Sequence, residues 1–250
     1  MSILTCAEVA FSYNGSVVVK GLDFNVEEGD YLCIVGENGS GKSTLVKGML
    51  GLKSPSCGSI SYGAGIAPHN IGYLPQQNEL QRTFPASVEE VVLSGRLANK
   101  GFRPFYSAHD RQIVDETLQR LGISDFKSYG FGQLSGGQQQ RVLLARALCT
   151  APDTMRMLIL DEPMSGLDPL IKQELYTLIK SINQQGVTII VVTHDVQTAV
   201  TYASHILHLE QRQIFYGSAH DFQHTEAGRE LIRDSCGGHC LVCGLGAQRG

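Results

Sequence analysis

The sequence predicts an α/β fold built around a doubly wound parallel sheet. Tyr31–Val35 is an unbroken apolar run without alternation, as expected of a parallel strand that is buried on both faces. Met157–Leu160 and Val187–Thr193 have the same character, and a helical pattern separates them. With 250 residues, of which 42% are hydrophobic, the chain is long enough to bury a sizeable core as one domain.

A smaller antiparallel sheet is expected before this core. Three short runs rich in β-forming residues, Ile3–Phe11, Ser16–Val19 and Leu22–Val26, lie in the first 30 residues. Turn signals at Asn14-Gly15 and Glu28-Gly29-Asp30 separate these runs from each other and from the first core strand. We therefore expect an N-terminal β subdomain.

The segment after the first core strand has the pattern of a phosphate-binding loop. It reads Gly36, Glu37, Asn38, Gly39, Ser40, Gly41, Lys42, Ser43, Thr44. A helix predicted over Lys42–Leu50 follows, closed by Gly51. In such a loop backbone N–H groups surround a phosphate, Lys42 reaches the β and γ phosphates, and Ser43 binds Mg²⁺. A chance glycine-rich turn is the alternative, and the flanking strand and helix argue against it.

Two acidic residues end the second core strand. Asp161 and Glu162 stand where open α/β sheets present groups to ligands. Asp161 is placed to hold Mg²⁺, directly or through water, and Glu162 to orient the attacking water or accept its proton. Solvated strand-end acids would be the commoner explanation of such a pair alone. The phosphate-binding loop in the same chain favours the catalytic interpretation.

Helical patterns dominate between the first and second core strands, from roughly Gln77 to Gly132. Ile113, Val114, Leu118 and Leu121 share one helical stripe, which indicates an inserted helical subdomain. The helix before the third core strand has its own apolar face, made by Ile171, Leu175, Leu178, Ile179 and Ile182.

A second glycine-containing segment opens another predicted helix. It reads Leu134, Ser135, Gly136, Gly137, Gln138, with the helix continuing through Gln139–Leu148. Ser135 is expected to cap this helix, whose N-terminus is an anion site without a ligand of its own. This segment and its helix resemble the signature of ABC ATPases.

This resemblance implies a P-loop NTPase fold of ABC type, with a RecA-like parallel-sheet core. An ATPase domain would span residues 1–225, with the α-helical subdomain inserted at about 77–150 and a C-terminal tail over 226–250. ATP and Mg²⁺ are the implied cofactors. The implied assembly is a head-to-tail homodimer, in which Ser135, Gly136, Gly137 and Gln138 face the γ phosphate held by the second copy.

Further family positions match residue by residue. Tyr13 matches the aromatic residue that stacks on adenine, although a structural tyrosine is the alternative. Gln76 matches the glutamine that contacts Mg²⁺ and the water; Gln77 is the alternative, and the preceding proline favours Gln76. Asp168 matches the residue that bridges the subunits, and His194 the switch histidine that contacts the γ phosphate. Because Glu162 and His194 are both present, an active ATPase is expected.

The implied partners are an integral membrane permease and, indirectly, an extracytoplasmic solute-binding protein. No apolar run approaches the roughly 18 to 20 residues that cross a bilayer, and the N-terminus lacks the features of a signal peptide. We therefore expect a peripheral protein on the cytoplasmic side of the membrane.

The cargo is predicted from a weaker pattern. Phe84–Arg96 resembles the corresponding stretch of ATPases that serve zinc and manganese importers. The alternatives are a stretch that only packs the helical subdomain, or an importer for iron chelates or cobalamin.

The cysteines form two groups. Four soft ligands crowd into eight residues of the tail, which favours a Zn²⁺ site, the alternative being an inert glycine-rich terminus: Cys236, His239, Cys240 and Cys243. The other four stand singly and are expected to be small buried side chains without disulfides: Cys6, Cys33, Cys57 and Cys149.

Charge and organisation argue against two rival functions. The net charge of -4 shows no basic excess for binding nucleic acid. ABC ATPases that act on nucleic acid or ribosomes usually carry two cores or a long coiled coil, and this chain has one core and a short insert. A regulatory module without turnover is the other rival, and Glu162 counts against it.

Overall fold

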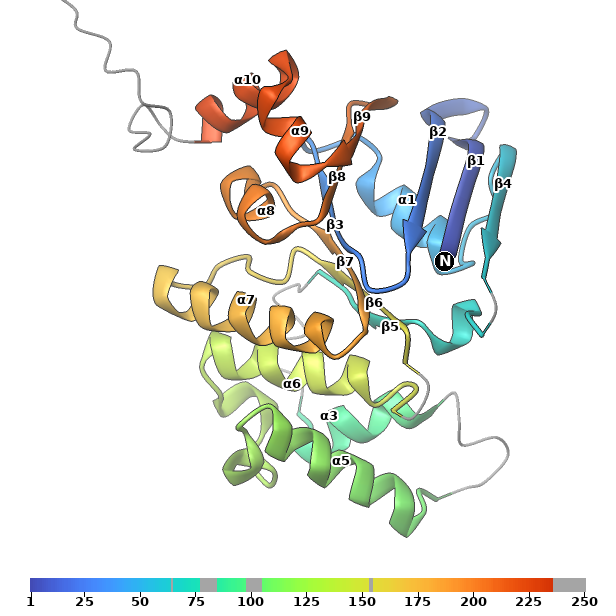
Figure 1. Ribbon diagram of the computed structural model, residues 1–250. Coiled ribbons are helices and arrows are strands. Elements are labelled where there is room, and N and C mark those ends of the chain that lie inside the picture. The colour runs from blue at the N-terminus through green and yellow to red at the C-terminus, as the bar shows by residue number, and fades with distance from the viewer. Residues whose placement is uncertain (64, 77–84, 98–104, 153–154, 236–250) are drawn as a thin grey trace, which may run out of the picture.

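The computed structural model describes the whole chain except residues 64, 77–84, 98–104, 153–154 and 236–250, and its centre is a six-stranded sheet (Figure 1). In spatial order the strands are β5 (Gly72–Leu74), β6 (Met157–Asp161), β7 (Thr188–Val192), β3 (Tyr31–Val35), β8 (His205–Leu209) and β9 (Gln213–Ser218). The first five are parallel and β9 runs antiparallel to β8. The expected doubly wound parallel sheet is therefore confirmed.

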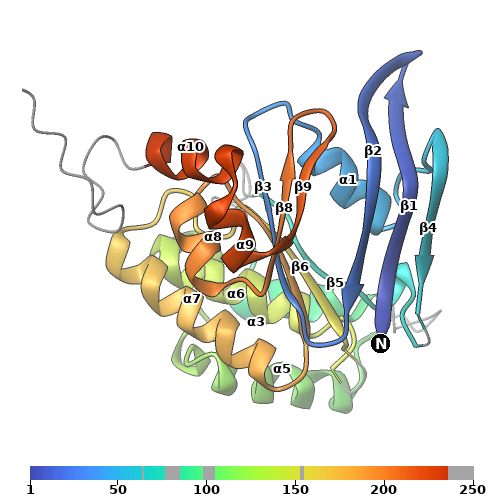
Figure 2. The same cartoon turned by 45° about the horizontal axis from the view of Figure 1, so that its top comes forward.

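A second, antiparallel sheet stands beside the first (Figure 2). It consists of β1 (Ser2–Tyr13), β2 (Ser16–Glu27) and β4 (Cys57–Tyr62), with β1 in the middle. The expectation of separate runs at Ser16–Val19 and Leu22–Val26 is wrong, because β2 continues through Gly21. That glycine has a φ of 63°, and shifts in the β1–β2 register absorb the irregularity without breaking the strand.

The central sheet separates two apolar cores because successive side chains of a strand point to opposite faces. In β3, Tyr31, Cys33 and Val35 join the core on the helical side. Leu32 and Ile34 join the core formed with α1 (Lys42–Met49) and the antiparallel sheet. The central strands are thus buried on both faces, and polar side chains begin in the loops that follow their ends.

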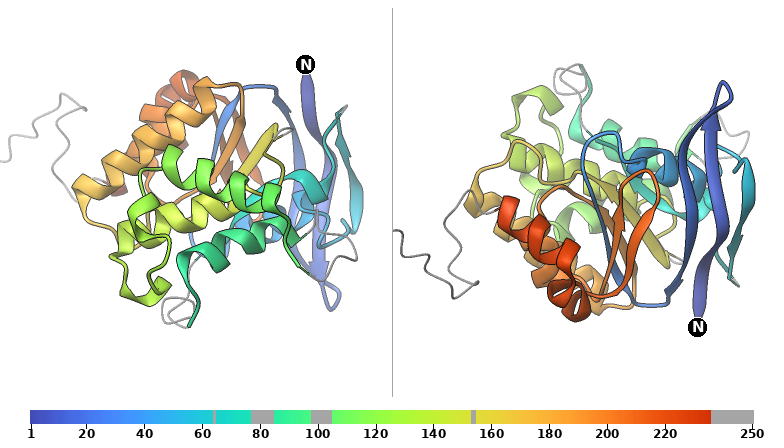
Figure 3. Two further views of the ribbon diagram at one scale, coloured as in Figure 1. Left: turned by 90° about the horizontal axis from the view of Figure 1, so that it is seen from below. Right: turned by 90° about the horizontal axis from the view of Figure 1, so that it is seen from above.

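The α-helices other than α1 cover the side of the central sheet away from the antiparallel sheet (Figure 3). They are α3 (Val88–Leu93), α5 (Ala108–Arg120), α6 (Gly136–Leu148), α7 (Pro169–Gln184), α8 (Val196–Tyr202), α9 (Ala219–His224) and α10 (Glu226–Ser235). The predicted apolar stripe of α5 is buried, and Leu175, Ile179 and Ile182 are the buried side chains of the stripe on α7. Among the described helices, none is long and apolar enough to cross a membrane.

A buried ion pair fastens the helical group. Arg96 Nε donates to Asp110 Oδ1 over 3.0 Å, and Arg96 Nη1 donates to the carbonyl oxygen of Cys149 at the end of α6. Burial alone would raise the pKa of Asp110, but hydrogen bonds from Ser107 and Arg96 outweigh it and lower the pKa to about 2. The guanidinium of Arg96, which follows α3 in the chain, therefore ties α5 to the end of α6.

Three of the four isolated cysteines are buried, as expected. The prediction is wrong for Cys57, which is exposed because it begins β4 at the edge of the smaller sheet. All four are free thiols. The cysteines of the tail lie outside the described residues.

Candidate functional site: a nucleotide cavity

The carboxyl ends of β3 and β6 and the beginning of α1 surround a cavity of about 190 Å³. Its lining combines the glycine-rich loop, the strand-end acids and one glutamine: Val18, Asn38, Gly39, Gly41, Lys42, Ser43, Thr44, Gln76, Asp161, Glu162 and Val192. Residues from five separate stretches of sequence therefore meet at one edge of the sheet. Gln76 lies in this lining, whereas Gln77 is outside the described residues.

Backbone geometry explains two glycines of the loop. Gly36 has a φ of 146°, and a Cβ there would lie 2.2 Å from the carbonyl oxygen of Leu209 on β8. Gly41 has a φ of 103°, and a Cβ would lie 2.8 Å from Val19 Cβ on β2. Both positions exclude a side chain by conformation and by space, so the loop keeps close to the sheet.

Lys42 is buried at the beginning of α1 and points its charge back at the loop. Its Nζ donates to the carbonyl oxygens of Gly36 and Glu37, each over 2.7 Å. Burial lowers the pKa of Lys42, an effect that the carboxylates of Glu162 and Asp161 oppose. The ammonium group is thus held in the cavity by loop carbonyls and by the field of the two acids.

Asp161 ends β6 with a buried carboxylate. Burial raises its pKa, the neighbouring charge of Glu162 adds to the effect, and Lys42 works against it. A buried carboxylate beside a serine hydroxyl and an amide oxygen is a set of hard oxygen donors, as Mg²⁺ prefers. The residues at this edge therefore fit a magnesium ion.

Glu162 adopts a conformation that is unusual for a residue with a side chain. Its φ is 50°, in the left-handed region, and its backbone N–H donates to the carbonyl oxygen of Val192 on β7. This conformation turns the side chain towards His194, whose Nδ1 lies 2.8 Å from Glu162 Oε2. The histidine is 68% exposed and the glutamate 12%, so the imidazole lies over the carboxylate on its solvent side.

The predicted signature residues form the beginning of α6 as expected. Ser135 Oγ accepts a hydrogen bond from the N–H of Gln138, and Gln138 Oε1 accepts one from the N–H of Ser135. A Cβ on Gly137 would lie 2.6 Å from Ile171 Cγ2 on α7, so the glycine permits close helix packing. None of Ser135, Gly136, Gly137 and Gln138 lines the phosphate-loop cavity of its own chain.

Two further predicted residues also lie outside the cavity lining. Tyr13 is 43% exposed, and Lys53 Nζ lies 3.8 Å from the centre of its ring. Asp168 precedes α7 and is exposed, without a side-chain bond to cap the helix. The structure thus unites the loop, Gln76, Asp161, Glu162 and, through Glu162, His194, whereas the other predicted positions do not line the cavity.

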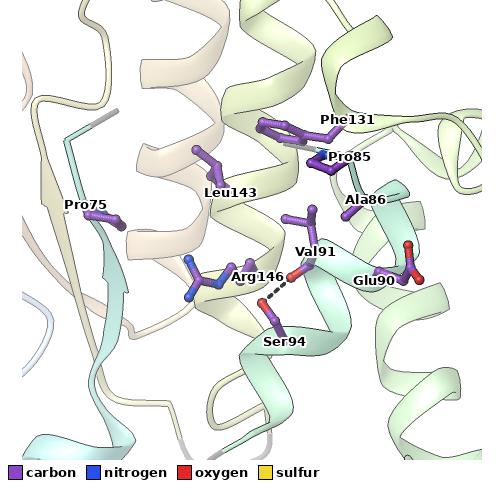
Figure 4. A pocket seen from close by; sticks show the side chains of 9 residues that line it. All are labelled: Pro75, Pro85, Ala86, Glu90, Val91, Ser94, Phe131, Leu143 and Arg146. Atoms are coloured by element: carbon purple, nitrogen blue, oxygen red, sulfur yellow. Dashed lines mark hydrogen bonds between the residues drawn. The ribbon is translucent and has the colours of Figure 1, made fainter. Parts of the chain in front are cut away.

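A larger cavity of about 500 Å³, which no sequence pattern indicated, lies between the end of β5 and the helices α3 and α6 (Figure 4). Its lining is Pro75, Pro85, Ala86, Glu90, Val91, Ser94, Phe131, Leu143 and Arg146. Ser94 Oγ donates to the carbonyl oxygen of Val91 at its edge. Part of the predicted cargo stretch contributes to this wall, but Phe84 lies outside the described residues, and no local pattern reveals that three elements enclose a space.

The fold and the cavity define the class of P-loop nucleotide-binding proteins. The family model described as "ABC transporter" matches residues 19–165. The chain belongs to this family.

Individual relatives agree with this assignment. The zinc uptake system ATP-binding protein ZurA of Listeria innocua is 38% identical over 236 residues, which cover 92% of this chain and 91% of that protein. The manganese transport system ATP-binding protein MntB of Bacillus subtilis is 38% identical, covering 88% and 91%. A solved metal-chelate type ABC transporter in an inward-facing conformation contains a similar chain, with a TM-score of 0.81, 28% identity, and 94% and 90% covered.

Proposed function

We propose that this chain is the ATP-hydrolysing subunit that energises import of a divalent metal ion, zinc or manganese, through a separate membrane permease. The observation that carries the proposal is the convergence of Lys42, Ser43, Gln76, Asp161 and Glu162 on one cavity beside a glycine-rich loop. These groups bind phosphates, hold a magnesium ion and position a water molecule, which are the requirements of phosphoryl transfer to water.

The loop and Lys42 bind the phosphates of ATP in this proposal. The ammonium group exchanges its bonds with the carbonyl oxygens of Gly36 and Glu37 for the β and γ phosphate oxygens. Ser43, Gln76 and Asp161 would hold Mg²⁺, which neutralises phosphate charge when bound. Tyr13 stacks on the adenine in this scheme, which requires Lys53 to leave its ring face.

Glu162 orients the attacking water and accepts its proton. The oxygen of that water bonds to the γ phosphorus as the bond to the β–γ bridging oxygen breaks, and ADP leaves with the electron pair. His194 keeps the carboxylate in place through its 2.8 Å contact and lies exposed enough to reach the γ phosphate.

A second copy of the chain completes the site. The beginning of α6 offers backbone N–H groups and a helix dipole suited to an anion, yet it does not line the cavity of its own chain. The exposed Asp168 follows Glu162 in the sequence, directly precedes α7, and is accessible for contact with the other copy. We therefore propose a head-to-tail dimer with two ATP molecules between the copies.

The 500 Å³ cavity is our candidate docking place for the permease. Its wall is largely apolar, with Val91, Phe131 and Leu143, and carries the charges of Glu90 and Arg146. Pro75 in the same wall directly precedes Gln76 of the nucleotide cavity. An occupant would therefore contact the segment that reaches the nucleotide. Such docking would hold the chain peripherally on the cytoplasmic side of the membrane, opposite an extracytoplasmic solute-binding protein.

The proposed cargo rests on the relatives. Proteins named for zinc uptake and manganese transport match nearly the whole chain at 38% identity. An iron-chelate or cobalamin importer is the second candidate, which the similarity to a metal-chelate type transporter favours.

ATP hydrolysis by the purified chain and its Glu162→Gln variant tests the motor. Turnover by the wild type and its loss in the variant, with ATP still bound, support the proposal. Absence of turnover both in the free chain and in the complex with its permease contradicts it.

The cargo is then tested by metal uptake into vesicles that contain the complex, comparing Zn²⁺, Mn²⁺ and an iron chelate, with the Glu162→Gln complex as the control.

The zinc site of the tail remains a separate prediction. Zinc binding by the wild type is compared with that of a variant in which Cys236, Cys240 and Cys243 are all serine. Equal binding by the two proteins would eliminate the tail site.

A further inference from the structure

Helix α9 carries two histidines outside the nucleotide cavity. His220 and His224 are four residues apart, so they lie on the same face of the helix one turn apart. Both side chains are exposed. Their ring centres are 4.8 Å apart and the ring planes are inclined by 60°.

This separation suits two imidazoles that share one metal ion. Zinc–nitrogen bonds of about 2.0–2.1 Å and near-tetrahedral angles place the centres of two coordinating rings roughly 5 Å apart. The observed separation already agrees with that value. Two histidines at this spacing on one helical face are also the arrangement by which a helix presents a pair of zinc ligands.

A carboxylate stands where it can orient the first imidazole. His220 Nδ1 lies 3.6 Å from Asp221 Oδ1, and Ser218 Oγ donates to Asp221 Oδ2 over 2.7 Å. Metal-binding histidines usually donate their other ring N–H to such a carboxylate, which fixes the tautomer and leaves the opposite nitrogen for the metal. A small rotation of the imidazole would bring Nδ1 of His220 within hydrogen-bonding distance of Asp221 and leave Nε2 for the ion.

The helix is held firmly beneath the two rings. Phe222, between them in sequence, is fully buried against Phe215, with ring centres 5.3 Å apart. At the other end of the helix Arg229 donates to the carbonyl oxygen of His224 over 2.6 Å. Metal binding would therefore require only side-chain rotation, because the backbone that carries the histidines is already in place.

We propose that His220 and His224 bind one divalent transition-metal ion through their Nε2 atoms, with Asp221 orienting His220. Within the described part of the chain no three or more His, Cys, Asp or Glu side chains gather into a metal-binding group, so water completes the coordination of this two-histidine site. Imidazole ligands select zinc, copper or nickel over magnesium and manganese. The proposal is independent of the nucleotide cavity and of the tail.

Calorimetric titration with ZnCl₂ tests the site, in a full-length background with serine at Cys57, Cys236, Cys240 and Cys243. We expect the His220→Ala/His224→Ala double variant to bind one zinc ion fewer per chain. Each single variant should raise the dissociation constant at least about 10-fold, and so should Asp221→Asn. His109→Ala, which removes an exposed histidine of α5, is the matched control and should bind as the background does.

The shift in melting temperature that zinc causes provides a second test, which applies even if a variant is less stable than the background. Zinc should raise the melting temperature of the background and of His109→Ala but not that of the double variant, and MgCl₂ should leave all three unchanged. The proposal is overturned if the double variant, folded by circular dichroism, binds as many zinc ions with the same affinity as the background.

Discussion

The phosphate-binding loop and the beginning of α6 are both glycine-rich segments that open a helix, yet their glycines serve different purposes. In the loop, Gly36 and Gly41 have positive φ angles and bring the chain against the sheet around a cavity. At α6, Gly137 instead allows the helix to pack on Ile171 of α7. The first segment lies with Asp161, and the second lines no part of that cavity.

One chain therefore carries two different parts of an ATP site, the phosphate-binding loop and the beginning of α6. On the loop side, Lys42 is bonded to loop carbonyl oxygens within the field of the two acids, and Glu162 contacts His194. The α6 side has a capped helix N-terminus and lacks the acids and the lysine. The first should therefore govern binding of ATP, and the second should affect only the step that brings two chains together.

The largest effect should come from the loop side. Lys42→Ala removes the buried cation and should reduce ATP binding and hydrolysis by about 100-fold or more. Lys47→Ala, on the exposed face of the same helix, is the matched control. Fluorescence titration with labelled ATP and a phosphate-release assay measure both effects. Equal behaviour of the two variants would remove Lys42 from the site.

A substitution at the beginning of α6 should reduce hydrolysis without reducing ATP binding, unlike Lys42→Ala. Gly137→Ala places a methyl group 2.6 Å from Ile171 Cγ2, so hydrolysis should fall by about 10-fold while ATP affinity stays unchanged. Adding Ile171→Ala makes room for the methyl group and should restore much of the activity. Loss of ATP affinity in Gly137→Ala would contradict the division between the two segments.

The stability contributed by the Asp110–Arg96 ion pair should depend on pH. At neutral pH Asp110→Asn should lower the free energy of unfolding by about 3 kcal/mol, because it leaves Arg96 buried without its charged partner. Since the folded pKa of Asp110 is lowered to about 2, its contribution is complete above an unfolded pKa of about 4 and disappears as the pH falls towards 2.

Urea unfolding at pH 7 and at low pH measures the difference in unfolding free energy between the wild type and Asp110→Asn. Asp115→Asn, which breaks an exposed ion pair with Lys127, is the control and should cost less than about 1 kcal/mol. If the loss of unfolding free energy in Asp110→Asn is the same at both pH values, the charge of Asp110 does not have the assigned role.

The smallest effect concerns magnesium. Because burial and Glu162 raise the pKa of Asp161, its carboxylate takes up a proton at a higher pH than an ordinary aspartate, whose pKa is about 4. Magnesium affinity in the presence of ATP should therefore begin to fall at mildly acidic pH, by a few-fold. Isothermal titration at stepwise lower pH measures this. A magnesium affinity that stays constant down to pH 4 would show that Asp161 is not protonated there.

Sequence patterns predicted the parts of the fold and site that depend on local chemistry. The strand–loop–helix of the phosphate loop and the cap by Ser135 depend on neighbouring residues, and both are present. The contact between Glu162 and His194 joins residues 32 positions apart and depends on a left-handed backbone at Glu162. The 500 Å³ cavity arises where separate helices meet β5, and Tyr13 lies under a lysine from another segment. Spacing in the sequence cannot reveal such contacts.

The central claim is that the α6 segment of one chain completes the ATP site of another. Light scattering of the Glu162→Gln variant in Mg²⁺ and ATP tests it directly, because the variant should hold ATP without hydrolysing it. We predict an ATP-dependent rise in mass to about twice 27.2 kDa, which is lost when Gly137→Ala is added although ATP still binds. A variant that binds ATP and remains a monomer at every protein concentration would contradict the account.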